Sequence, residues 1–166
     1  MDNVTLIGMP GSGKSTVGVL LAKTLGYGFL DTDLVLQRRE GALLQELLDR
    51  RGLAAFLDAE EAAIRSVDCA RTVIAPGGSA VCRPGAIGHL RQLGRVVYLR
   101  LSLGALEGRV NNIGTRGIAM SPGQTLADVY ADRAPLYDQY ADCTVDADGQ
   151  TLEETVSAVL RALAAR

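Results

Sequence analysis

Eight residues near the N-terminus have the types and the spacing of a phosphate-binding loop. Residues 8–15 read GMPGSGKS, which fits the pattern G-x-x-x-x-G-K-[ST]. Glycines let successive backbone N–H groups curl around an anion, and a helix start adds unpaired donors and partial positive charge. Lys14 can reach the outer phosphates of a nucleoside triphosphate, and the Ser15 hydroxyl can ligate Mg²⁺. The segment therefore predicts a triphosphate site formed by Gly11, Ser12, Gly13, Lys14, Ser15 and Thr16.

Two aspartates follow the next apolar segment. Asp31 and Asp33 lie at the end of residues 28–31, which are predicted to form the second strand. Ligands of open parallel sheets bind beyond the carboxyl ends of the strands, so both carboxylates are expected near the phosphate loop. One could hold Mg²⁺ through its water shell, and the other could accept the proton of a hydroxyl that attacks the terminal phosphate. The alternative is that one of them, Asp33 by its position, caps the following helix.

Three further features could contact a ligand. Gly77 and Gly78 follow the third predicted strand, where they allow close backbone approach or form a plain turn. Residues 111–123 have no clear period, which is typical of a lid or binding loop. Within that lid Arg116 could close over phosphates, and Arg133 on the next helix could bind a carboxylate. Other arginines are expected to be solvated surface residues: Arg38, Arg39, Arg50 and Arg51.

Short apolar segments alternate with amphipathic ones along the chain, which indicates a parallel sheet covered by helices on both faces. Strands are predicted at residues 3–8, 28–31, 72–75, 96–99 and 143–145. Helices are predicted at residues 14–25, 34–37, 43–48, 53–67, 84–93, 103–110 and 126–140, and after a capping box from Thr151 to Glu154. We therefore expect an α/β protein with one domain over residues 1–166.

Composition narrows the classes of partner. Hydrophobic residues make up 48% of the 166, which is ample for a core, and the net charge of −2 argues against nucleic acid or an anionic membrane surface. No segment approaches the roughly 18 apolar residues of a membrane span. The N-terminus enters a strand without a charged leader, so no secretory signal is expected. The expectation is a cytoplasmic monomer that acts on a small molecule.

Several different motifs follow one another along nearly the whole chain. The segments are residues 8–16, residues 30–33, Phe56 with Glu60 and Glu61, Gly77 and Gly78 before Ala80 and Val81, residues 96–99, Arg116, and residues 133–137. Together they resemble the shikimate kinase family of small P-loop kinases. The resemblance implies a three-layer α/β/α fold of the P-loop NTPase type, with a five-stranded parallel sheet in the order 2-3-1-4-5 and a lid. It also implies ATP and Mg²⁺ as cofactors, and transfer of the γ-phosphate to a hydroxyl of shikimate.

On the donor side, the resemblance implies a role for each matched residue. Lys14 would contact the β- and γ-phosphates. Ser15 would ligate Mg²⁺, and Asp31 would support the metal through water. Arg116 would bind ATP by covering the transferred phosphate, and it would be catalytic together with Lys14 and the acceptor-side base.

On the acceptor side, the resemblance implies three contacts and one departure. Asp33 would bind the acceptor hydroxyl and act as the base, Gly78 would contact the acceptor, and Arg133 would bind its carboxylate. The family motif F-R-x-x-E reads FLDAE at residues 56–60, so Leu57 stands where the family has a second carboxylate-binding arginine. Loss of one charge-assisted contact should weaken binding of the same ligand by about 2–4 kcal/mol.

The altered acceptor motif leaves alternatives open. Another arginine, such as Arg83, could replace the missing contact in a shikimate kinase. The acceptor could instead be a different small hydroxyl compound, such as homoserine or a sugar acid, and Asp58 could attract an ammonium group. The third family glycine is replaced as well, by Ser79. A non-catalytic ATP-binding module is a second class, which the retained aspartates and arginines of the site disfavour. A nucleoside monophosphate kinase is a third, which the arginine-poor acceptor side disfavours.

Overall fold

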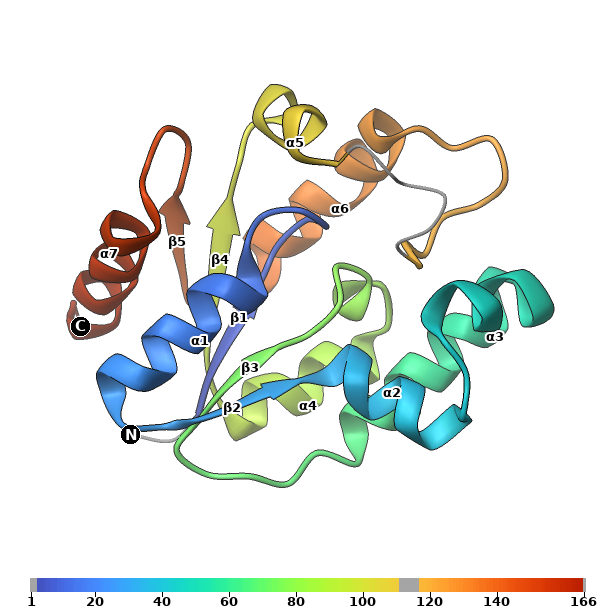
Figure 1. Ribbon diagram of the computed structural model, residues 1–166, viewed down its shortest axis with the longest axis horizontal. Helices are drawn as coiled ribbons and strands as arrows, with labels where there is room; N and C mark the ends of the chain where they lie inside the picture. The colour runs from blue at the N-terminus through green and yellow to red at the C-terminus, as the bar shows by residue number, and fades with distance from the viewer. Residues whose placement is uncertain (1–2, 111–116, 166) are drawn as a thin grey trace.

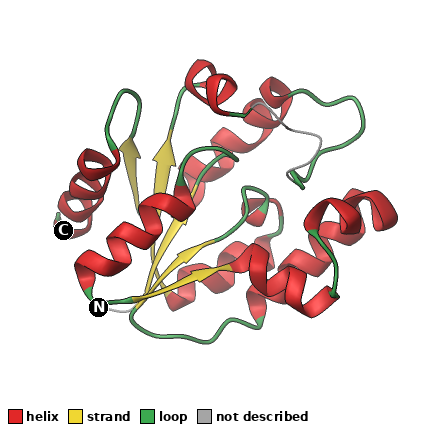
Figure 2. Ribbon diagram, in the orientation of Figure 1, coloured by secondary structure: helices red, strands yellow, loops and turns green. Residues whose placement is uncertain are grey.

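Five parallel strands form the centre of the molecule, with helices on both faces (Figure 1, Figure 2). The computed structural model describes residues 3–110 and 117–165. The strands are β1 (Asn3–Ile7), β2 (Gly28–Asp31), β3 (Thr72–Ala75), β4 (Gly94–Arg100) and β5 (Cys143–Asp146). Their order is β2-β3-β1-β4-β5 and each neighbouring pair is parallel, which confirms the predicted sheet.

The helices form two layers and a separate lobe. They are α1 (Lys14–Leu25), α2 (Thr32–Glu40), α3 (Leu44–Arg65), α4 (Pro84–Leu93), α5 (Leu103–Arg109), α6 (Leu126–Tyr140) and α7 (Leu152–Ala164), with a short 3₁₀ helix, η1 (Ala80–Cys82). Apolar residues of α1 and α7 pack on one sheet face, and those of α4 and α6 on the other. A third apolar cluster joins α2 to α3, which extend beyond the β2 edge in Figure 1.

The predicted helices at residues 43–48 and 53–67 are wrong in one respect, because they belong to one kinked helix, α3. Gly52 has φ 79° and ψ 173°, so it bends the backbone while helical residues continue on both sides. The helix predicted at residues 34–37 starts earlier, at Thr32, because the Asp31 side chain accepts a hydrogen bond from the Asp33 N–H. Asp31 is therefore the N-cap of α2, and the alternative that Asp33 is the cap is wrong.

A buried asparagine joins neighbouring segments at the amino end of the sheet. Asn3 is 2% exposed, and its Nδ2 donates to the carbonyls of Cys69 and Leu93 at 2.7 and 3.2 Å. Its Oδ1 accepts from the Thr72 N–H at 2.9 Å. With this end fixed, the carboxyl ends of β1, β2 and β3 meet at the opposite edge. The predicted phosphate loop, Asp31 and the glycine pair follow those three strand ends.

The predicted lid is described in part. Residues 111–116, including Arg116, lie outside the described residues. Beyond them, the Gly117 N–H donates to Gln45 Oε1 at 3.1 Å, and Ile118 and Ala119 are buried. Residues 117–119, the lid's stem, therefore pack on the first turn of α3. Among the residues described, no helix combines the length and the apolar character needed to cross a bilayer.

Asn3→Ala should destabilise the protein by about 2–4 kcal/mol, because it leaves buried backbone groups of three segments without partners. For a chain of this size, the expected fall in Tm is roughly 5–15 °C. Thermal unfolding by circular dichroism measures it. Thr24→Ala, which removes an exposed hydroxyl bonded to a helix carbonyl, is the control and should shift Tm far less. An Asn3→Ala variant as stable as this control would contradict the assignment.

Candidate active site

The loop after β1 has the conformation of an anion site. Gly11 and Gly13 have φ 82° and 89°, values that side chains rarely tolerate. Gly13 is the N-cap of α1 and provides no side-chain cap, so the first N–H groups of the helix remain for a ligand. The Lys14 side chain folds over the loop, and its Nζ donates to the carbonyls of Gly8 and Met9 at 2.8 and 2.9 Å. The loop thus presents a cation beside a set of backbone donors.

A hydroxyl and a carboxylate stand next to this loop. Ser15 Oγ donates to Asp31 Oδ2 at 3.3 Å, while Asp31 Oδ1 accepts from the Asp33 N–H at 2.8 Å. Within the described residues, no group of three or more His, Cys, Asp or Glu side chains could hold a metal on its own. This donor set fits Mg²⁺, which proteins commonly hold through one or two side-chain oxygens together with substrate phosphates and water.

A cavity of about 220 Å³ opens at the carboxyl edge of the sheet. It collects most of the predicted site residues: Gly11, Gly13, Lys14, Ser15, Thr16, Asp31, Asp33, Gly78 and Arg133. Ser12 does not line it; this side chain is 3% exposed, with its Oγ 3.5 Å from Lys14 Nζ. Arg116 lies outside the described residues. The lid's stem contributes Ile118 and Ala119, so the cavity lies between the phosphate loop and the stem.

Two carboxyl groups, of the half-buried Asp33 and the buried Glu60, face the cavity on either side of a glycine. Burial and the negative charge of Asp31 raise the pKa of Asp33 to about 6, against the opposing effect of Lys14. A Cβ atom at Gly77 would lie 2.7 Å from Asp33 Oδ1 and 2.9 Å from Glu60 Oε2, so a side chain there would displace one of the two carboxyl groups. Asp33 therefore has the surroundings of a general base, whose efficiency is greatest with a pKa near the working pH.

Glu60 is the acidic residue whose role the sequence did not reveal. It is 3% exposed, and burial raises its pKa to about 7, further raised by Asp33 and opposed by the hydrogen bond from Ser79. Phe56 and Glu60 both line the cavity because they lie one turn apart on α3. That spacing was the signal that could have identified Glu60.

A buried arginine lines the cavity from α6. Arg133 is 6% exposed, and its NH2 donates to the carbonyl of Ala119 in the lid's stem. Its NH1 is also buried and has no hydrogen-bond partner in the described part of the chain. One turn further on, the Tyr137 hydroxyl donates to the Gly78 carbonyl at 2.5 Å and so fixes the glycine segment. Arg133 thus offers a positively charged donor to an anionic ligand group.

The side chains at the positions tied to the altered motif do not line the cavity, although the adjacent Phe56 does. Leu57 is half-buried and packs against the α2–α3 cluster. Arg83 NH2 donates to Asp58 Oδ1 at 2.9 Å and to the Ala54 carbonyl at 3.3 Å, so Arg83 is held at the outside of α3. Arg83 does not line the cavity, and its replacement of the missing carboxylate contact stays a prediction. Arg83 also gives Asp58 a partner other than a ligand ammonium group.

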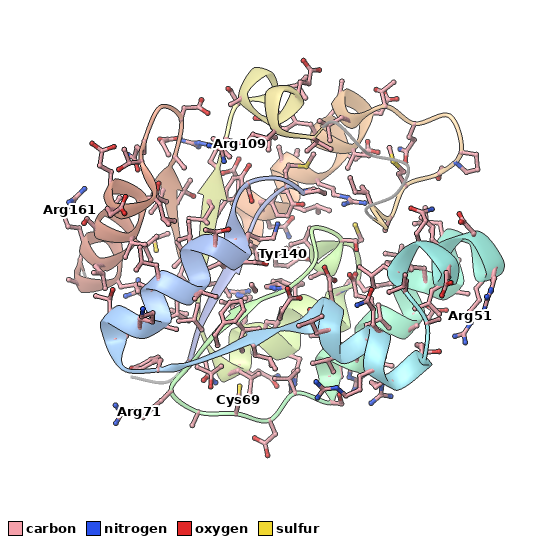
Figure 3. The ribbon with its side chains drawn as sticks, in the orientation of Figure 1. Arg51, Cys69, Arg71, Arg109, Tyr140 and Arg161 are labelled. Carbon is pink, nitrogen blue, oxygen red and sulfur yellow. The ribbon has the colours of Figure 1, made fainter. Side chains whose placement is uncertain are left out.

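Surface arginines lie where the sequence analysis expects them. The four that were assigned to solvent are exposed: Arg38, Arg39, Arg50 and Arg51. Figure 3 shows Arg51 at the outline of the molecule, pointing away from the sheet, and it pairs with Glu40 at 2.6 Å. These side chains are therefore separate from the cavity, in contrast to Arg133.

Comparisons with known proteins identify close relatives. A sequence model of the family described as shikimate kinase matches residues 10–164. A shikimate kinase of Pseudomonas fluorescens is 39% identical over 168 residues, covering 99% of this chain and 97% of the relative. One of Paracidovorax citrulli is 41% identical over 144 residues, covering 84% and 79%. The solved structure of an Acinetobacter baumannii shikimate kinase in complex with shikimate matches with a TM-score of 0.89 and 28% identity, covering 99% and 93%.

Glu60 should give the unliganded protein a pH-dependent stability. Its folded-state pKa of about 7 exceeds the ordinary value of 4.5, so its stabilising contribution is full below pH 4.5 and is lost as pH rises to about 7. Glu60→Gln lacks this loss. Relative to wild type, the variant should therefore gain roughly 3 kcal/mol of unfolding free energy across that interval.

Urea denaturation at a series of pH values, in the presence of EDTA, measures this difference. Glu153→Gln, which neutralises an exposed glutamate on α7, controls for loss of a negative charge. A difference between Glu60→Gln and wild type that does not change with pH would contradict the burial argument.

Proposed function

The chain belongs to the shikimate kinase family, and on that premise we propose that it transfers the γ-phosphate of ATP to a hydroxyl of shikimate. It is a phosphotransferase with an alcohol group as acceptor. The observation that carries the proposal is the meeting of Lys14, Asp33 and Arg133 at one cavity. These three supply a phosphate-binding cation, a base and a carboxylate-binding cation, which the reaction needs together.

The phosphate loop would hold the donor. Backbone N–H groups at Gly13 and the start of α1 would bind the phosphates, with Lys14 neutralising charge on the β- and γ-oxygens. Ser15 and, through water, Asp31 would hold Mg²⁺, which neutralises further charge on the phosphate oxygens when bound. Arg116 would cover the transferred phosphate from the lid.

Asp33 would act on the acceptor hydroxyl. As the hydroxyl oxygen forms its bond to the γ-phosphorus, the bond to the β,γ-bridging oxygen breaks and ADP leaves; the hydroxyl proton passes to Asp33. The raised pKa of Asp33, about 6, suits a group that accepts and later returns a proton near neutrality. Arg133 NH1 would bind the acceptor's carboxylate, and the backbone of Gly78 would contact the acceptor beside it.

We also propose a cytoplasmic monomer, since ATP and Mg²⁺ are supplied in the cytoplasm. One chain brings a phosphate-binding cation, a base and a carboxylate-binding cation to the same cavity, which supports a monomer. A net charge of −2 gives the protein no electrostatic attraction to nucleic acid or anionic lipid.

Lys14→Ala and Asp33→Asn should each reduce turnover of shikimate by a factor of about 10² to 10⁴. Lys14→Ala removes the cation at the phosphates, and Asp33→Asn removes the base while keeping its shape. A coupled assay of Mg²⁺-dependent ADP release measures both. Near-normal turnover by Asp33→Asn would exclude Asp33 as the base.

A panel of acceptors separates this proposal from the alternatives. Shikimate, homoserine, threonine, gluconate and nucleoside monophosphates are each tested with the wild-type protein. If no acceptor raises ADP release while ATP still raises Tm, the chain is an ATP-binding module without turnover. Faster turnover of another acceptor than of shikimate would reassign the substrate.

Leu57→Arg should lower the KM for shikimate by about tenfold or more, since it places a second guanidinium near the acceptor side. Steady-state kinetics with varied shikimate measure it. Leu43→Arg adds the same charge at a position that is 61% exposed and serves as the control. An unchanged or raised KM in Leu57→Arg alone would indicate that the pocket is shaped for a different acceptor.

A further inference from the structure

A serine directly follows the two glycines at the end of β3. Its backbone has φ −90° and ψ 0°, a conformation that residues with side chains adopt, so Ser79 is not confined to glycine by strain. Ser79 is 4% exposed, and its Oγ lies 2.7 and 2.8 Å from the two carboxylate oxygens of Glu60. The hydroxyl therefore serves one specific contact across the cavity wall.

Charged groups from three elements surround Glu60. Asp33 of α2 disfavours its ionised form, whereas Arg133 of α6 and Lys14 of α1 favour it. In the described part of the chain, the hydrogen bonds to the Glu60 carboxylate come from Ser79. The ion pairs found among those residues do not include one between Glu60 and Arg133.

The arrangement leaves a choice between two partners for Glu60. A buried carboxylate without hydrogen bonds is strongly unfavourable, so Glu60 needs a donor close by. Arg133 is a candidate, since its NH1 is buried without a partner among the described residues. Because the Ser79 hydroxyl supplies the donor, Glu60 remains beside Gly77 and Arg133 keeps NH1 for a ligand.

We propose that Ser79 is a positioning residue: by binding both oxygens of Glu60, it keeps this carboxylate from pairing with Arg133 and so preserves Arg133 for the acceptor's carboxylate. This rests on the proposed function, which assigns Arg133 to the acceptor. Without the hydroxyl, Glu60 pairs with Arg133, and the acceptor must break that pair before it binds. Ser79 thus controls acceptor affinity and leaves the transfer step itself unchanged.

Steady-state kinetics of Ser79→Ala and Ser79→Thr test this role. The KM for shikimate should rise about 10- to 100-fold in Ser79→Ala, while kcat and the KM for ATP stay close to wild type. Ser79→Thr keeps the hydroxyl and should restore most of the affinity. Ser66→Ala removes a hydroxyl bonded to a carbonyl at the end of α3 and is the matched control. An unchanged KM for shikimate in folded Ser79→Ala overturns the proposal.

A double-variant comparison separates positioning from general damage. In a Glu60→Gln background the uncharged amide forms no ion pair with Arg133, so adding Ser79→Ala should raise the KM much less than it does in wild type. Equal increases in both backgrounds would mean that Ser79 acts independently of Glu60, and would overturn the proposal.

A crystal structure of unliganded Ser79→Ala gives a readout that does not depend on the acceptor. The expected result is an ion pair between Glu60 and Arg133; a carboxylate still beside Gly77 overturns the proposal. If the wild-type protein fails to phosphorylate shikimate, the proposed function fails. The crystal structure then still decides whether Ser79 holds Glu60 apart from Arg133.

Discussion

Burial of three charged side chains and half-burial of a fourth around one cavity is the constraint on which the site depends. Lys14, Asp33, Glu60 and Arg133 come from four different helices, and buried charges are tolerable only when they are partnered. The loop carbonyls bind Lys14, Ser79 binds Glu60, and the carbonyl of Ala119 binds Arg133. These contacts involve the phosphate loop, the segment after β3 and the lid's stem. The hydrogen bonds that stabilise the charges therefore also hold these three segments in place.

The strand order of the sheet brings these segments together. β1 lies between β3 and β4, and β2 lies outside β3, so the loops after β1, β2 and β3 emerge side by side. A donor phosphate held after β1 is therefore next to a base that follows β2 and to a backbone contact that follows β3. Asn3 stabilises the opposite end of the same sheet. The Asn3 hydrogen bonds and the cavity thus lie at opposite ends of the strands.

Local patterns predicted the elements and the nucleotide side of the site, because a phosphate loop depends on residues adjacent in the sequence. Local patterns did not predict the features that depend on contacts between segments distant in the sequence. The continuation of α3 through Gly52 depends on packing against α2, which no helical period reports. Spacing could not decide between Asp31 and Asp33 as the cap. The bond between Ser79 and Glu60 joins the segment after β3 to α3, and the two residues lie nineteen positions apart in the sequence, so only the assembled fold reveals it.

The separate apolar cluster of α2 and α3 has an evolutionary consequence. Leu36, Leu47, Phe56 and Ala63 pack there with Ala119, apart from the two clusters that cover the sheet faces. Substitutions of these side chains can therefore accumulate while α1 keeps its packing against β1 and β3. A lineage of such proteins can explore new acceptors by drift within one lobe, while it inherits the phosphate donor site unchanged.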